Sequence, residues 1–210
     1  MAMDWTKAAI LAGWALASAV IAPASTAAAA PALPHASAAA VGGRTSVPYG
    51  WVDFCNRYAS DCDVQPLDPV DIDLTPAAFR DIERIDRQVN AAVTPETDMD
   101  HWGVVDRWDY PTDGKGDCED YALLKRKLLI HAGYPRQALL MTVVKDLDGE
   151  GHAILTVKTS RGDFVLDNLT DKVLPWSDTG YKFIKRQSQA DPNLWQSIGT
   201  PAAGPQFTAK

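Results

Sequence analysis

The sequence lacks an excess of positive charge. Its 210 residues include 20 Lys and Arg against 27 Asp and Glu, which gives a formal net charge of −7 at pH 7. A nucleic-acid partner requires a basic face, so this balance argues against one, although it does not discriminate among protein substrates. The sequence also contains no internal repeat, and its length is sufficient for one domain with a substantial core.

Long apolar segments are also scarce, and the clearest one lies near the N-terminus. The run from Ala8 to Ala22 follows Lys7 and precedes a group of small residues. It is shorter than the ~20 apolar residues that a spanning helix requires, so a cleaved export signal over residues 1–30 is favoured over a membrane anchor. The sequence therefore predicts a periplasmic or secreted protein.

Outside this leader, composition suggests where the folded domain begins and ends. Residues 31–47 are rich in Ala, Pro and Ser, which is typical of a disordered lead-in. The domain itself is expected to span residues 48–197. The chain becomes rich in Pro and Gly after Asp191, where fraying is expected, and residues 198–210 are predicted to be a flexible tail.

Cysteine is rare, with three in the whole chain. Cys55 and Cys62 lie in residues 48–69, which are predicted to form a loop, and in an exported protein this pair is expected to form a disulfide. Metal binding by the pair is the alternative, but no second Cys or His pair stands at zinc-ligand spacing. Cys118 is then left without a partner cysteine, which makes it a candidate reactive thiol.

Cys118 stands at the predicted start of an amphipathic helix. Asp117 is a favoured N-cap residue, and Asp120, three residues later, can complete a capping box with it. Apolar residues then recur at helical spacing until Gly133, which is expected to end the helix. Backbone N–H groups and the positive end of the helix dipole would favour the nucleophilic thiolate. The alternative is a buried structural thiol.

Other periodic patterns predict a second long helix and several strands. Thr75 is a good N-cap for a helix over residues 76–92, which is assigned to core packing. The strands are predicted at residues 137–145, 152–158, 163–169 and 181–186. The segment before Cys118 contains aromatic residues that could wall a groove or cover the core: His101, Trp102, Trp108 and Tyr110.

The predicted hairpin places His152 at the start of one strand and Asp167 near the end of its partner. Antiparallel pairing brings these ends together, although the sequence does not fix the register. His152 would hold a Cys118 thiolate and protonate the leaving amine, while Asp167 would orient the imidazole. The backbone N–H of Cys118 would contribute to an oxyanion hole.

Three sequence blocks include the candidate residues: Gly116-Asp117-Cys118-Glu119-Asp120-Tyr121-Ala122, Gly151-His152-Ala153-Ile154-Leu155 and Leu166-Asp167-Asn168. With these blocks the sequence resembles those of bacterial transglutaminase-like cysteine proteinases. The resemblance extends over residues 48–197 and implies an α+β fold, with a papain/transglutaminase-like core in which the cysteine-bearing helix packs on an antiparallel β-sheet. It also implies a catalytic triad of Cys118, His152 and Asp167.

The resemblance further implies calcium dependence, with carboxylates beside the cysteine as ligands. In this sequence those carboxylates are Asp117, Asp120 and Glu119. A carboxylate next to a thiolate repels it, and a bound Ca²⁺ would cancel that repulsion. The alternative is that Asp117 and Asp120 serve only as helix caps.

The leading functional hypothesis is an exported cysteine endopeptidase that cleaves a protein through a thioester acyl-enzyme. By resemblance, its substrate could be a surface or periplasmic protein such as an adhesin, and an inner-membrane protein could regulate it. A transglutaminase or amidase acting on protein amides would use the same triad with a different acceptor. A catalytically silent binding module is the third hypothesis.

Overall fold

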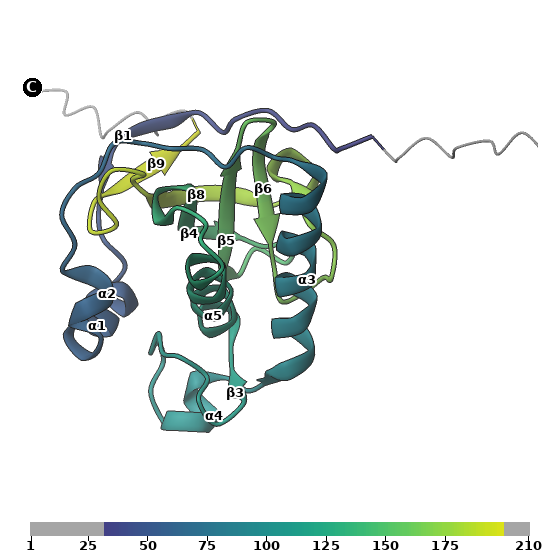
Figure 1. The fold of residues 1–210 in the computed structure, drawn as a ribbon. Helices are drawn as coiled ribbons and strands as arrows, with labels where there is room; N and C mark the ends of the chain where they lie inside the picture. The colour runs from purple at the N-terminus through teal and green to yellow at the C-terminus, as the bar shows by residue number, and fades with distance from the viewer. Residues whose placement is uncertain (1–31, 200–210) are drawn as a thin grey trace, which may run out of the picture. The chain divides into compact units, whose positions relative to one another are not determined.

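A seven-stranded antiparallel sheet forms the centre of the protein in the computed structural model, which describes residues 32–199 (Figure 1). Its strand order is β1-β9-β8-β4-β5-β6-β7, and two further strands, β2 and β3, pair in parallel outside it. The strands are β1 Val41–Thr45, β2 Thr94–Pro95, β3 Lys115–Gly116, β4 Leu139–Lys145, β5 Gly151–Thr159, β6 Gly162–Leu166, β7 Leu174–Pro175, β8 Lys182–Gln187 and β9 Trp195–Ile198.

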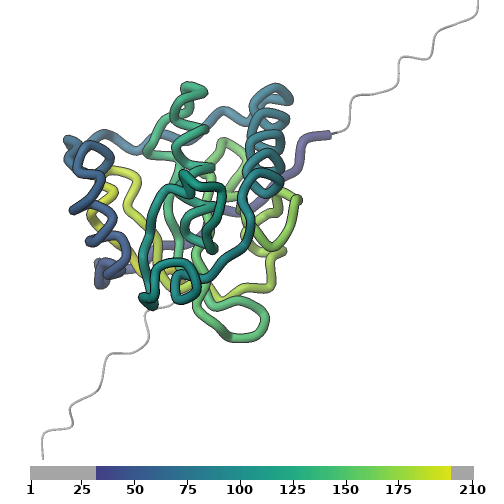
Figure 2. Tube along the Cα trace, turned by 90° about the horizontal axis from the view of Figure 1, so that it is seen from below, coloured from purple at the N-terminus to yellow at the C-terminus, as the bar shows by residue number. Residues whose placement is uncertain are grey.

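The two long helices pack against one face of this sheet. Helix α5 contacts β5 and β4, and α3 packs against α5. Figure 2 shows the segment that carries α4 between α1 on the left and α3 on the right. The helices are α1 Tyr49–Arg57, α2 Ala59–Cys62, α3 Pro76–Ala92, α4 Asp98–Trp102, α5 Cys118–His131, η1 Arg136–Ala138 and η2 Trp176–Asp178.

Alternate residues of the central strands enter two different apolar clusters. Leu155 and Val157 of β5 join the main core beneath α3 and α5. Ile154 of the same strand joins a smaller cluster on the other face, where Trp176 and Phe183 cover it. This period of two is the pattern that a strand buried on both faces requires.

Both predicted long helices are confirmed. Helix α3 spans Pro76–Ala92, and the Thr75 side chain accepts a hydrogen bond from Ala78 N at 3.1 Å. Helix α5 begins at Cys118, and Gly133 follows it with a φ of +94°. The four predicted strands correspond to β4, β5, β6 and β8, so the expected α+β class is also confirmed.

The prediction of disorder over residues 31–47 is wrong for the described part of that segment. Strand β1 pairs with β9, and the buried Asp163 accepts a hydrogen bond from Ala39 N at 3.0 Å. Fraying after Asp191 is also wrong up to residue 199, because Trp195 of β9 is 1% exposed. The segment that contains β1 and the segment that contains β9 stabilise each other by strand pairing. Pairing between distant segments leaves no local pattern in the sequence that would predict it.

The predicted loop over residues 48–69 instead contains α1 and α2. The predicted disulfide between Cys55 and Cys62 is present and joins these two short helices. Aromatic packing holds them on the domain, since Trp51 stacks on Phe54 and both side chains are almost fully buried. Short helices with few turns give little periodicity, which is why turn residues dominated the sequence pattern.

The predicted export signal over residues 1–30 lies outside the described residues, as do residues 200–210 of the predicted tail. Within residues 32–199, no helix has both the length and the apolar character needed to cross a membrane.

Candidate active site

Cys118 occupies the first position of α5, as predicted, but the acidic residues around it do not form the expected capping box. The N-cap residue Asp117 makes no side-chain capping bond. Its Oδ2 accepts from Asp98 N at 3.2 Å, and Asp120 Oδ1 accepts from Asp109 N at 2.7 Å. Both carboxylates therefore bind the segment that precedes the helix, which sequence spacing could not reveal.

His152 and Asp167 are in direct contact. His152 Nε2 lies 2.8 Å from Asp167 Oδ1, and their side chains are 6% and 2% exposed. The hairpin register pairs Leu155 with Leu166, so Asp167 follows the last residue of β6. Because Nε2 is engaged by Asp167, Nδ1 is the ring nitrogen that remains for proton exchange with a nucleophile.

Two further groups donate hydrogen bonds to the Asp167 carboxylate. Tyr181 donates its hydroxyl to Oδ2 at 2.6 Å, and Leu169 N donates to Oδ1 at 3.1 Å. Burial alone would raise the pKa of Asp167, but the hydrogen bonds and the charge of His152 lower it overall. The Tyr181 ring also meets the His152 ring edge to face, with centroids 5.7 Å apart.

Replacing Tyr181 with Phe should lower kcat about 10-fold, roughly 1.4 kcal/mol, because Asp167 loses a donor that holds it against His152. Loss of that donor also raises the pKa of Asp167, so the acid limb of the kcat/KM profile should move to higher pH. Tyr134→Phe is the matched control, since Tyr134 bonds Asp81 at 3.4 Å outside this site. Unchanged kcat and an unchanged pH profile in Tyr181→Phe would contradict this role.

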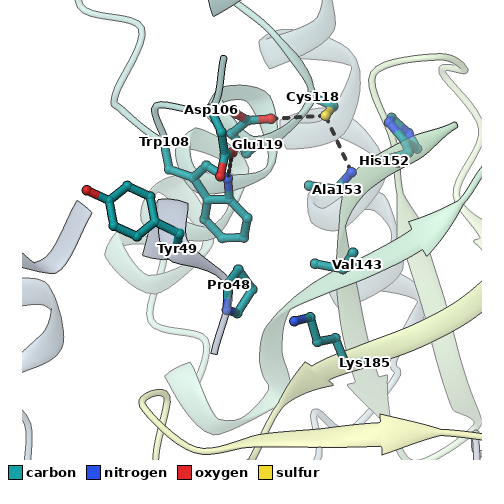
Figure 3. A pocket seen from close by; sticks show the side chains of 11 residues that line it. Pro48, Tyr49, Asp106, Trp108, Cys118, Glu119, Val143, His152, Ala153 and Lys185 are labelled. Atoms are coloured by element: carbon teal, nitrogen blue, oxygen red, sulfur yellow. Dashed lines mark hydrogen bonds between the residues drawn. The ribbon is translucent and has the colours of Figure 1, made fainter. Parts of the chain in front are cut away.

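Cys118 and His152 line one pocket of about 330 Å³ (Figure 3). The Cys118 sulfur accepts a hydrogen bond from Ala153 N at 3.4 Å, and its thiol donates to Glu119 Oε2 at 3.0 Å. Within residues 32–199, no hydrogen bond joins Cys118 to His152. The nucleophile candidate therefore lies against the residue that follows His152, with its proton directed at a carboxylate.

The expected stabilisation of the thiolate is wrong for this arrangement. Burial is the largest effect that raises the pKa of Cys118, and the adjacent Glu119 carboxylate raises it further. The hydrogen bond from Ala153 N acts in the opposite direction but does not offset these effects on the pKa of Cys118. A thiolate at Cys118 thus requires the charge beside it to be compensated.

Five carboxylates gather beside Cys118: Asp98, Asp106, Asp117, Glu119 and Asp120. Asp98 and Asp106 are distant in sequence and were not among the predicted ligands. The side chains of Asp98 and Glu119 are buried. Oδ1 of Asp117 is also buried, and it has no hydrogen-bond partner in the described part of the chain. Oxygens of two subsets lie within 4.8 Å of one another: Asp98, Asp106 and Glu119; and Asp98, Asp117 and Asp120.

This cluster holds more negative charge than its surroundings compensate. Burial, followed by the charges of Asp117 and Asp98, raises the pKa of Asp120 to about 8, against a hydrogen bond from Asp109 N that lowers it. Hard divalent cations prefer several carboxylate oxygens as ligands. The donor set therefore fits Ca²⁺, and it includes all three carboxylates that the resemblance implied.

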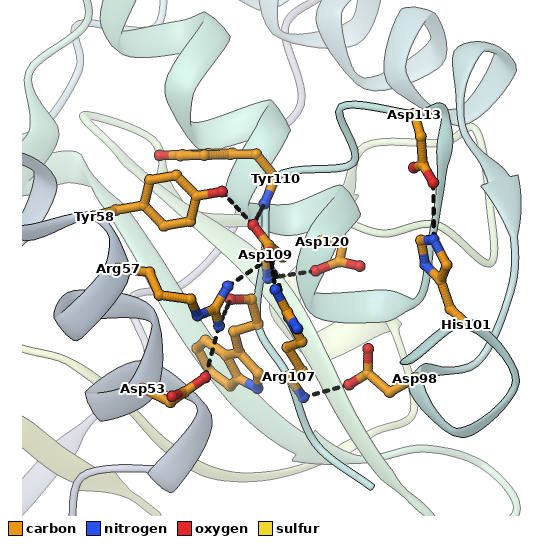
Figure 4. A network of polar contacts seen from close by, with 11 residues as sticks. Asp53, Arg57, Tyr58, Asp98, His101, Arg107, Asp109, Tyr110, Asp113 and Asp120 are labelled. Atoms are coloured by element: carbon orange, nitrogen blue, oxygen red, sulfur yellow. Dashed lines mark hydrogen bonds and ion pairs between the residues drawn. The ribbon is translucent and has the colours of Figure 1, made fainter. Parts of the chain in front are cut away.

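Asp109 connects this cluster to α1 (Figure 4). Its Oδ2 bonds Arg57 Nη1 at 2.5 Å and Arg107 Nη2 at 3.2 Å, and Tyr58 donates to its Oδ1. Its backbone N–H reaches Asp120. The disulfide-bearing helices and the carboxylates beside Cys118 thus share one polar network.

The aromatic residues before Cys118 have different roles. Trp108 lines the pocket, and Tyr110 is buried in the main core. Trp102 is 42% exposed and stacks on His101. His101 Nε2 lies 2.8 Å from Asp113 Oδ2, and His101 does not line the pocket. It is therefore not positioned to accept a proton from Cys118.

Residues 41–203 match the family described as bacterial transglutaminase-like cysteine proteinase BTLCP. The chain belongs to this family. It is therefore a transglutaminase-like cysteine peptidase, and the resemblance inferred from the sequence is confirmed. No curated protein matches the chain.

Solved structures of LapG from Legionella pneumophila are similar to this family member. Calcium-bound LapG is 25% identical with a TM-score of 0.50, and the match covers 62% of this chain and 76% of LapG. A second LapG structure is 27% identical, with a TM-score of 0.48 and coverage of 59% and 71%. EGTA-treated LapG is 25% identical, with a TM-score of 0.48 and coverage of 61% and 74%.

Proposed function

We propose that this peptidase is an endopeptidase that uses Cys118, His152 and Asp167 as its catalytic triad. One observation carries the proposal: a buried His152–Asp167 pair shares a pocket with an unpaired cysteine at a helix start. A shared pocket of this kind supports joint action of a nucleophile, a base and an orienting carboxylate.

Each residue has a defined part in the reaction. The Cys118 thiol transfers its proton to His152 Nδ1, and the thiolate attacks the scissile carbonyl carbon. Free N–H groups in the first turn of α5, including that of Cys118, face the oxyanion. His152 returns the proton to the leaving amine, which leaves a thioester that water hydrolyses with His152 as base.

The proposed substrate is a protein outside the cytoplasm, with a surface adhesin as the leading candidate. The predicted export signal and the Cys55–Cys62 disulfide support an oxidising compartment, periplasmic or extracellular. An inner-membrane partner that regulates the enzyme belongs to the same proposal and rests on the family resemblance.

New protein termini would test the function directly. Surface and periplasmic proteins should gain new N-termini in cells that contain the wild-type chain, and none of these should appear with Cys118→Ala. A substrate identified in this way should gain the mass of water on cleavage. Loss of ammonia with transfer to an amine would instead establish the transglutaminase alternative, and identical termini in both strains would reject the proposed endopeptidase function.

We also propose that Ca²⁺ binds the carboxylate cluster, with Asp98, Asp106, Asp117, Glu119 and Asp120 as the available oxygen donors. LapG has been solved with calcium bound, and the donor set in this chain has the oxygen chemistry that calcium prefers. A bound cation would supply positive charge beside Cys118. Glu119 could then act as a metal ligand instead of holding the thiol proton.

Calcium should raise the melting temperature of EGTA-treated protein. At a concentration 100-fold above Kd, binding to the folded state contributes about 2.7 kcal/mol, which corresponds to roughly 5–10 °C for a chain of this size. Asp98→Asn should abolish the shift, whereas Asp148→Asn, at an exposed turn position, should retain it. Equal melting temperatures in calcium and in EGTA would reject the metal site.

A further inference from the structure

Lys185 lines the active-site pocket at the end away from Cys118 (Figure 3). Its side chain is half-buried, and Nζ donates to Ser46 O at 3.0 Å and to Ser46 Oγ at 3.2 Å. An ammonium has three N–H donors, so one donor remains for another acceptor.

Lys185 differs from the buried lysines of this protein in having no carboxylate partner. Lys125 pairs with Asp86 at 2.7 Å and Lys158 pairs with Asp163 at 2.8 Å. Within residues 32–199, no carboxylate lies within 4.0 Å of Lys185 Nζ. Partial burial lowers the pKa of Lys185, as expected for a cation that loses water without gaining an opposite charge.

The sheet register fixes how far Lys185 lies from the reacting sulfur. Ala153, whose N–H contacts Cys118, pairs with Val143, and Val143 pairs with Lys185. The three residues thus form a row across β5, β4 and β8. Two steps of about 4.8 Å between strands separate the ends of the row by roughly 10 Å, which an extended peptide covers in about three residues.

A register shift on β8 keeps Lys185 in this row. Val143 pairs with Lys185 while Val144 pairs with Phe183, so Ile184 is an extra residue on that strand. The irregularity lets Phe183 pack with Trp176 on the opposite face of the sheet. Bulges of this kind re-aim side chains and are frequent beside active sites.

We infer that Lys185 forms a substrate subsite for a carboxylate located two to four residues from the cleaved bond. The inference rests on the proposed endopeptidase function and names a feature of its substrates. Lys185 lies at the end of the pocket away from Cys118, whereas Asp106 and Glu119 at the Cys118 end are among the proposed Ca²⁺ ligands. A substrate carboxylate about three residues from the cleaved bond is therefore attracted to the Lys185 ammonium.

Cleavage-site profiling on a peptide library tests the subsite. Wild-type enzyme should enrich Asp and Glu at one position two to four residues from the cleaved bond, and matched Glu peptides should be cleaved about 10-fold faster than Gln peptides. Lys185→Glu should reverse this ratio and favour Lys or Arg there. Lys182→Glu is the matched control, since it makes the same charge change at an exposed position of β8 and should retain the wild-type ratio.

The ratio of the cleavage rates of Glu and Gln peptides separates a change in substrate specificity from a structural effect of the Lys185→Glu substitution. Release of Ser46 in Lys185→Glu would slow all peptides equally and leave the Glu-to-Gln ratio unchanged, which would overturn the inference. Peptides with free and amidated C-termini show whether a side chain or a chain terminus supplies the carboxylate. Cleavage without acidic preference contradicts the subsite alone, whereas no cleavage by the wild type contradicts the endopeptidase function on which it rests.

Discussion

Replacing His152 with Ala is expected to lower kcat on the order of 10⁶-fold, because proton transfer from Cys118 and to the leaving amine both depend on its imidazole. Asp167→Asn should cost less, on the order of 10⁴-fold, since the amide still contacts His152 but no longer stabilises its positive charge. Rates on a peptide substrate from the terminus profiling would give these values.

The double variant is the decisive member of this series. Residues that act as one unit give strongly non-additive losses, so His152→Ala with Asp167→Asn should be no slower than His152→Ala alone. His131→Ala is a control at the C-terminal end of α5, and it should retain wild-type kcat. Additive losses from His152 and Asp167 would show that they contribute through separate routes.

Replacing Asp86 with Ala should destabilise the protein by about 3–5 kcal/mol, because it leaves a buried ammonium without a partner. Asp86 of α3 and Lys125 of α5 are 0% and 1% exposed, and their charged atoms lie 2.7 Å apart. Burial raises the pKa of Asp86 to about 6, while the charge of Lys125 acts against this shift. Urea unfolding of the purified variant measures the free-energy difference.

Two further variants show whether the buried charge is the cause. Removing both charges with Asp86→Leu and Lys125→Met should restore stability to near the wild-type value. Asp81→Ala breaks an exposed ion pair with Arg84 on the same helix, and it should change stability by less than about 1 kcal/mol. A loss below about 1 kcal/mol in Asp86→Ala would contradict this account of the pair.

Local sequence signals were sufficient for the elements that carry the catalytic candidates. Thr75 and Gly133 mark helix ends through hydrogen bonding and left-handed backbone, both of which depend on the residue itself. The hairpin that places His152 and Asp167 at the same end follows from alternation and one short turn, although its register comes only from the structure. These features act over a few residues, so the sequence alone predicts them.

Features that depend on distant segments could not be predicted in the same way. Strands β1 and β9 lie near opposite ends of the described chain and pair with each other. Asp117 and Asp120, which were predicted to cap α5, accept hydrogen bonds from the segment of residues 98–109. Asp98 and Asp106 join the cluster because that segment folds over α5. The thiol pKa depends on burial and on the orientation of Glu119, neither of which spacing along a helix determines.

Alkylation of Cys118 by iodoacetamide, followed over pH at saturating calcium, tests the proposed relay most directly. With calcium bound, Cys118 should react as a thiolate with a pKa well below the ~8.5 of a free cysteine, and this component should be lost in His152→Ala and in EGTA. Slow alkylation with an ordinary thiol profile that is the same in wild type and His152→Ala would contradict it.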